Sequence, residues 1–172
     1  MKELFGFDAF SPKEIAERIE QTGVVKSRLP LLALCMLGIL AGVFIGLGAM
    51  FYILVVSDTN LGFAWSRLLS GFVFSLGLIM VTVAGAELFT GNNLLVMAWA
   101  DGKISLKSVL RNWGVVSLSN FVGALLLAYL LSLTRYPELN QGKIGTKYVM
   151  IAAEKCQLTF QQAFFRGILS NI

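Results

Sequence analysis

The chain has 172 residues, of which 56% are hydrophobic and only 14% are charged, and its net charge is +4. A soluble domain carries about 25% charged residues, so this composition is typical of a membrane protein. The chain contains no histidine, which excludes histidine-based catalysis and most histidine metal sites from these residues. Its basic residues near the N-terminus form no run, so we expect no nucleic-acid partner.

The segment 11–23, "SPKEIAERIEQTG", predicts a short amphipathic helix. Ser11 is a good N-cap, Pro12 suits the first helical position, and Glu14 completes a capping box. We expect Gly23 to end the helix. The apolar stripe of the helix is narrow, so two interpretations stay open. The helix lies against the membrane or the cytoplasmic face of the protein, or it is a solvated leader.

Four hydrophobic stretches follow, at residues 29–56, 68–100, 115–133 and 158–172. A spanning helix needs roughly 20 apolar residues, so the first three stretches are long enough to cross a bilayer. The last stretch begins with polar residues and is too short. We therefore expect an all-α membrane protein, and we expect this chain to be an N-terminal fragment that ends inside a fourth spanning helix.

In the first hydrophobic stretch, Gly38, Gly42 and Gly46 recur at every fourth residue. This spacing places the three glycines on one face of a helix. Another helix backbone can approach closely there, because no side chain stands between the two backbones.

The basic residues favour one orientation in the membrane. With a cytoplasmic N-terminus, segments 1–28 and 101–111 lie inside and hold more Lys and Arg than the outer segments 57–67 and 135–157. This distribution agrees with the positive-inside rule. We therefore expect residues 1–28 to be cytoplasmic. The outer segments are also fairly basic, which would attract anions.

Residues 85–93, "GAELFTGNN", interrupt the second hydrophobic stretch near its middle. Unpaired backbone groups cannot face lipid, so a break at membrane depth must lie inside protein or beside a water-filled cavity. We expect Gly85 and Gly91 to bracket this break. A charged, unpaired Glu87 would cost about 2.5–3.5 kcal/mol, so we expect it to be neutral or paired with backbone amides. The alternative is a kinked helix whose polar patch only packs.

Four segments together resemble the formate/nitrite transporter family. They are "SPKEIAERIEQTGVVKS", "FSLGLIMVTVAGAELFTGNNLLVMAWADGKIS", "RNWGVVSLSNFVGALL" and "AEKCQLTFQQAFFRGILSN". The resemblance implies an aquaporin-like inverted-repeat helical bundle of six membrane helices, in which the second and fifth are broken. It implies a homopentamer in the cell inner membrane or plasma membrane, with one pore per protomer. Residues 29–172 would then be a partial channel domain with helices 1 to 3 and the start of helix 4.

The resemblance also implies a substrate pathway. Leu78, Leu88 and Phe89 resemble the apolar constriction on the cytoplasmic side, and Phe74 resembles part of the outer constriction. Thr90 resembles the hydroxyl that bonds the central histidine of the pore. That histidine belongs to the fifth helix, which we expect beyond the end of this sequence. Packing is the competing interpretation for Phe74 and Leu78, because aromatic stripes on one helical face are more often core than pore.

Further positions carry weaker expectations. Lys155 resembles the basic residue near the outer vestibule, and Asn171 matches the asparagine of the fourth-helix motif. From the residues alone, Lys155 could be a solvated lysine and Asn171 a packing amide. The loop at the break is expected to be built by Gly85, Glu87, Gly91 and Asn92.

The function implied is a channel or transporter for small monovalent anions of weak acids, most of all formate, with nitrite or hydrosulfide as alternatives. A bare anion is costly to desolvate in a dry constriction, whereas a neutral acid is not, so coupling to protons is a hypothesis. A membrane enzyme is disfavoured, because the chain has no metal-ligand spacing and no serine with a base partner. A structural membrane subunit is a more remote alternative. No cofactor or metal is expected.

Overall fold

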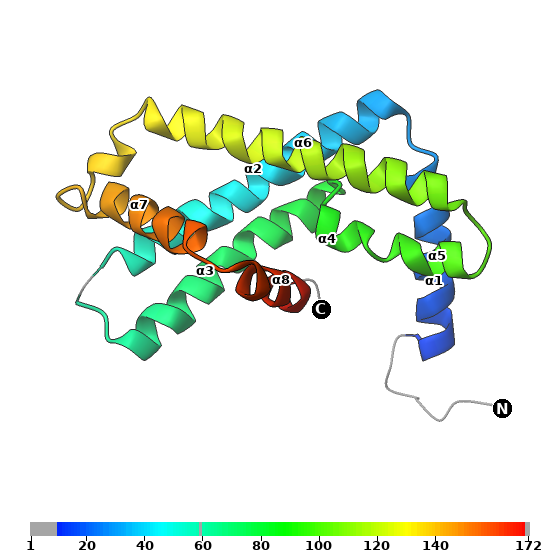
Figure 1. Ribbon diagram of the computed structural model, residues 1–172, viewed down its shortest axis with the longest axis horizontal. Helices are drawn as coiled ribbons and strands as arrows, with labels where there is room; N and C mark the ends of the chain where they lie inside the picture. The colour runs from blue at the N-terminus through cyan, green and yellow to red at the C-terminus, as the bar shows by residue number, and fades with distance from the viewer. Residues whose placement is uncertain (1–9, 59, 171–172) are drawn as a thin grey trace.

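The computed structural model describes residues 10–58 and 60–170 (Figure 1). Along the chain its elements are α1 (Pro12–Ser27), α2 (Leu31–Val56), α3 (Phe63–Ala84), α4 (Phe89–Asn92), α5 (Leu95–Ala100), α6 (Leu106–Ser132), the 3₁₀-helix η1 (Tyr136–Glu138), α7 (Lys143–Cys156) and α8 (Phe160–Leu169). Every regular element in the two described ranges is a helix, which confirms the predicted all-α class.

Three helices, α2, α3 and α6, have the length and apolar composition of membrane spans. They contain 26, 22 and 27 residues. At a rise of about 1.5 Å per residue, each is long enough to cross a hydrocarbon core of roughly 30 Å. Helices α2 and α6 cover the first and third predicted membrane stretches without interruption. Helix α3 covers only the first part of the second stretch, because it ends at Ala84.

Helix α2 packs against both α3 and α6 (Figure 1). Its glycines Gly38, Gly42 and Gly46 face α6, as their spacing predicts. A Cβ atom added at Gly42 would lie 2.1 Å from the carbonyl oxygen of Asn120, and one added at Gly46 would lie 2.6 Å from a methyl carbon of Leu127. The two helices reach this separation only because these positions carry no side chain.

A second close approach joins α2 to α3. A Cβ atom added at Gly48 would lie 2.8 Å from the carbonyl oxygen of Phe74, and one added at Gly77 would lie 2.9 Å from that of Phe44. Both distances are shorter than a carbon and an oxygen tolerate. The two glycines therefore set the separation of α2 and α3 near the middle of both helices.

Helix α1 begins with the predicted capping box. The backbone N–H of Glu14 donates to the Ser11 hydroxyl at 3.4 Å, and the backbone N–H of Ser11 donates to the Glu14 carboxylate at 2.7 Å. The prediction that Gly23 ends this helix is wrong, because α1 continues to Ser27. Gly23 is buried against α5, where an added Cβ atom would lie 3.1 Å from the Cβ of Ala98. Helices α1 and α5 lie side by side (Figure 1), and Gly23 allows their close contact instead of forming a left-handed C-cap.

The elements after α6 are short. Helix α7 begins at Lys143 and packs against η1, and its Ile144 is fully buried. Helix α8 opens with a second capping box, in which the Thr159 hydroxyl accepts from the backbone N–H of Gln162 at 3.3 Å. All of the described residues of α8 are exposed. Its apolar side chains therefore have no cover within the described part of the chain.

Candidate functional site

The second hydrophobic stretch is discontinuous, as the sequence predicts. Helix α3 ends at Ala84, and the next residue, Gly85, has a left-handed backbone at φ 62° and ψ 30°. The chain then runs without helix to Leu88, which has an extended backbone, and α4 begins at Phe89. Gly85 marks one end of the break, but Gly91 does not mark the other, because it lies inside α4 without a positive φ. Leu88 marks the other end of the break, because it is the last extended residue before α4 begins.

Asn120 of α6 satisfies the backbone of this break. Its side-chain oxygen accepts from the backbone N–H of Phe89 at 2.9 Å, and its amide nitrogen donates to the carbonyl oxygens of Gly38 at 2.8 Å and Glu87 at 2.9 Å. The backbone N–H of Glu87 donates to the Leu37 carbonyl at 3.2 Å. The loose backbone is thus paired inside protein, as a break at membrane depth requires. Sequence reasoning missed this role. The available signal was the side-chain amide of Asn120, which stands within the apolar stretch 115–133.

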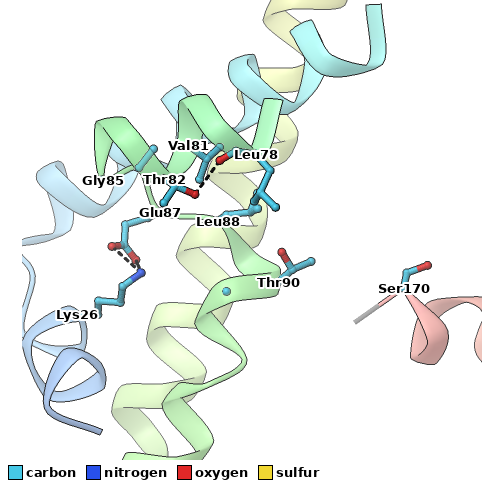
Figure 2. Close-up of a pocket in the computed structure, with 11 residues that line it drawn as sticks. Lys26, Leu78, Val81, Thr82, Gly85, Glu87, Leu88, Thr90 and Ser170 are labelled. Carbon is cyan, nitrogen blue, oxygen red and sulfur yellow. Dashed lines mark hydrogen bonds and ion pairs between the residues drawn. The ribbon is translucent and has the colours of Figure 1, made fainter. Parts of the chain in front are cut away.

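Glu87 is buried, with 4% of the residue exposed, and its carboxylate has side-chain partners. The Lys26 ammonium of α1 lies 3.2 Å from one carboxylate oxygen and 3.3 Å from the other (Figure 2). The Asn92 amide donates to the second oxygen at 2.7 Å, and Lys26 also donates to the Asn92 carbonyl oxygen at 2.9 Å. The partners of this carboxylate are therefore side chains, and not the backbone amides that the sequence led us to expect. Because α1 runs past Gly23, it carries a lysine to the break.

Asn92 connects this ion pair to α6. Its amide also donates to the Asn112 side-chain oxygen at 2.9 Å, and its backbone carbonyl accepts from the Trp113 indole N–H at 3.0 Å. Both asparagine side chains are fully buried. The Phe89 ring meets the Trp113 ring edge-on, with centroids 6.2 Å apart. These contacts hold α4, the half-helix after the break, against α6.

A cavity of about 540 Å³ lies beside the break (Figure 2). Its apolar wall includes Leu78 from α3 and Leu88 from the loop, and its polar wall includes the Thr90 hydroxyl and the Lys26–Glu87 pair. The remaining lining residues are Val81, Thr82, Gly85, Ala86, Gly91 and Ser170. The structure thus brings Leu78, Leu88 and Thr90 to one cavity. Phe89 does not line this cavity, because its ring packs on Trp113.

A second cavity, of about 790 Å³, lies near the C-terminal end of α2 and the start of α3. Phe74 and Lys155, the two residues expected at the outer side, both line this cavity, which we call the outer cavity. Tyr52, Arg67 and Lys147 line the same cavity, and sequence reasoning assigned none of them to the pathway. Asn171, the remaining predicted residue, lies outside the described residues.

Helix α1 is also held at a point away from the break. Lys103, in the turn between α5 and α6, forms ion pairs with Asp101, at 2.8 Å, and with Glu20 of α1. The hydrogen bonds that the Lys103 ammonium donates to the carboxylates of Asp101 and Glu20 raise the pKa of Lys103 above its ordinary value. The ammonium form of Lys103 therefore links α1 to the α5–α6 turn across the neutral pH range.

The chain resembles known channels over most of its length. The family profile described as formate/nitrite transporter matches residues 13–172. Over 167 residues the chain is 38% identical to formate channel FocA of Escherichia coli strain K12. This alignment covers 96% of this chain and 59% of that protein. Over 164 residues it is 40% identical to formate channel BtFdhC of Bacillus thuringiensis, with 93% and 62% covered.

A solved structure gives the same result for the fold. The chain matches a pentameric formate channel with formate bound at a TM-score of 0.73 and 34% identity, over 94% of this chain and 58% of that chain. The chain thus spans about three-fifths of the length of these relatives. Because the family profile covers nearly the whole sequence, this chain belongs to the formate/nitrite transporter family.

Proposed function

We propose that the protein is a membrane channel for small monovalent anions of weak acids, and that formate is its main substrate. One observation carries the proposal: a membrane helix is broken at Gly85–Leu88, its backbone is paired inside protein, and the break borders a cavity. Discontinuous helices of this kind mark solute sites near the middle of the membrane. The relatives named as formate channels support the choice of substrate.

The proposed route begins at the outer cavity. Arg67, Lys147 and Lys155 line that cavity together with the acidic Asp58 and Glu154, so its side chains carry a net charge of +1 by formal count (+3 and −2). Positive potential at a mouth raises the local concentration of anions. These side chains would therefore draw a small anion towards Phe74, which we propose as part of the outer constriction.

The inner part of the route is proposed to be apolar. Leu78 and Leu88 would form the cytoplasmic constriction with Phe89 behind them, and the Thr90 hydroxyl would offer a hydrogen bond to the passing solute. A hydrated anion loses its water in such a constriction, which is costly, whereas a neutral acid loses much less. We therefore propose that the substrate takes up a proton before it crosses, so that proton and anion move together.

The same relatives support the proposed assembly and placement. The neighbour described as pentameric favours a homopentamer, and the exposed apolar residues of α3 and α6 fit contact with lipid or with other copies. The distribution of basic residues favours a cytoplasmic N-terminus in the cell membrane. We propose a channel and not an enzyme, because the relatives are named channels or transporters.

The direct test is solute flux into liposomes that contain the complete protein. We expect uptake of formate to exceed the leak of empty liposomes and to rise as the outside pH falls towards the pKa of formic acid. Thr90→Val is expected to reduce uptake, whereas Thr146→Val, on the exposed side of α7, serves as the matched control. Uptake of nitrite or hydrosulfide in preference to formate would show that formate is not the main substrate. No flux of any of the three would favour the structural subunit.

A further inference from the structure

The outer cavity contains a hydrogen-bonded pair, Arg67 and Tyr52, of which the proposed route uses only the charge of Arg67. The Arg67 guanidinium of α3 donates to the Tyr52 hydroxyl of α2 at 2.8 Å. The same guanidinium lies over the Phe63 ring, 5.4 Å from its centroid. Among the described residues Arg67 forms no salt bridge. Its hydrogen bond therefore goes to a neutral phenol, and its charge stays available to the cavity.

Tyr52 in turn contacts the proposed outer constriction. The Tyr52 and Phe74 rings meet edge to face, with centroids 6.5 Å apart and planes at 83°. This geometry is the one that the charge distribution of two aromatic rings favours. Arg67, Tyr52 and Phe74 thus form a continuous chain of contacts, and all three line the outer cavity.

The backbone around Phe74 is fixed independently of this contact. Gly48 stands one helical turn before Tyr52, on the same face of α2. An added Cβ atom at Gly48 would lie 2.8 Å from the Phe74 carbonyl oxygen, so α2 and α3 are in backbone contact there. The position of the Phe74 backbone is therefore set by glycine packing. The ring is 38% exposed, so burial alone does not fix its direction.

We propose that Tyr52, held by Arg67, is a positioning residue that fixes the Phe74 ring and thereby sets the size of solute that the outer mouth admits. This inference rests on the proposed function, because it assigns Phe74 to the constriction. In this proposal the Tyr52 hydroxyl accepts the hydrogen bond from Arg67, and this bond holds the Tyr52 ring in its edge-to-face contact with Phe74. Phenylalanine at position 52 would keep the ring contact but lose this hold.

The first test measures selectivity by solute size. The complete protein, in liposomes, is compared with Tyr52→Leu, Tyr52→Phe and the control Tyr129→Leu, whose side chain is exposed on α6. The measurement is the ratio of formate uptake to lactate uptake. An edge-to-face pair shifts an equilibrium by up to about tenfold, so we expect Tyr52→Leu to lower the ratio by about fivefold. Tyr52→Phe is expected to fall between wild type and Tyr52→Leu, and the control is expected to match wild type.

The second test reports on the ring itself and needs no transport. Fluorine at the para position of the Phe74 ring gives a ¹⁹F resonance in the complete protein. We expect one narrow resonance with Tyr52 present, and a shifted or broadened resonance in Tyr52→Leu but not in Tyr129→Leu. A Tyr52→Leu protein with an unchanged resonance overturns the positioning role. So does an unchanged formate-to-lactate ratio in a protein that transports formate.

The two measurements separate this inference from the proposed function. If wild-type protein carries no small acid, the proposed function fails, while the ¹⁹F spectrum still decides whether Tyr52 positions Phe74. If wild-type protein carries formate and Tyr52→Leu leaves both readouts unchanged, the function stands and the inference fails.

Discussion

Lys26 and Glu87 stand 61 residues apart in the sequence, yet the Lys26 ammonium lies 3.2 Å from the Glu87 carboxylate. This ion pair ties α1 to the break in the second membrane stretch. The Glu87 side chain is 5% exposed and the Lys26 side chain is 26% exposed. Glu87 therefore depends more on Lys26 than Lys26 depends on Glu87, because the more buried charge has less water to replace a lost partner.

This difference gives a prediction about stability. Lys26→Met leaves a buried carboxylate without its cation, so we expect it to cost about 3 kcal/mol. Glu87→Gln leaves a lysine that still reaches water and Asn92, so we expect a loss of about 1 kcal/mol. The free energy of unfolding of each variant, measured in micelles, checks the order. The double variant should be more stable than Lys26→Met alone; equal losses from the two single changes would contradict the account of the pair.

Asn120 gives a prediction about the loop. Asn120→Leu leaves the N–H of Phe89 and the carbonyl oxygens of Gly38 and Glu87 without this partner. Each unsatisfied buried group costs about 1–3 kcal/mol, so we expect a total loss of about 3 kcal/mol or more. Ser117→Leu, at an exposed position of the same helix, is the control. Thermal midpoints in detergent compare the two, and a midpoint for Asn120→Leu equal to that of the control would show that the loop does not depend on this amide.

The contact of α2 with α6 gives a third prediction. Gly42→Ala places a carbon 2.1 Å from the Asn120 carbonyl oxygen, which α6 can relieve only by moving away. Overpacking of this kind costs about 1–3 kcal/mol. Gly114→Ala is the matched control, because nothing lies within 4 Å of its added carbon. The yield of folded protein and its thermal midpoint should fall for Gly42→Ala only. A stabilised Gly42→Ala protein would contradict the packing described above.

The outer cavity gives a prediction about rates. Replacing both Lys147 and Lys155 by Gln removes two of the cations that line it. We expect formate uptake from the outer side to fall about threefold at low ionic strength, and we expect the difference to vanish at about 1 M salt, where charges are screened within roughly 3 Å. Lys107→Gln, on α6, is the control. A loss that persists unchanged in high salt would point to damaged structure and not to attraction of the anion.

Much of the fold can be predicted from local sequence. The hydrophobic stretches, the capping box at Ser11 and the four-residue spacing of Gly38, Gly42 and Gly46 each depend on neighbours within one helix. The break was predictable for the same reason, because polar residues and glycines in an apolar stretch are costly unless they are paired. These inferences need no knowledge of which helices meet.

The parts that sequence reasoning missed depend on contacts between distant segments. Gly23 resembles a C-cap, but α5 packs against it and α1 continues. Glu87 was expected to use backbone amides, but the longer α1 brings Lys26 within reach. Asn120 could be recognised as polar, yet its three partners come from α2, the loop and the first residue of α4. In each case the local pattern allows several partners, and only the packing of helices selects one.

The most direct test of the central claim asks whether solutes pass the break. In the complete protein with Cys35 and Cys156 replaced by Ser, Thr90→Cys is treated with a small, water-soluble methanethiosulfonate reagent. Leu118→Cys, whose side chain is exposed on the apolar face of α6, is the control. We predict that Thr90→Cys reacts, that formate slows the reaction, and that labelled protein loses formate flux. A Thr90→Cys protein that stays unlabelled, or that is labelled and keeps its full flux, would contradict the claim that the break lines the route.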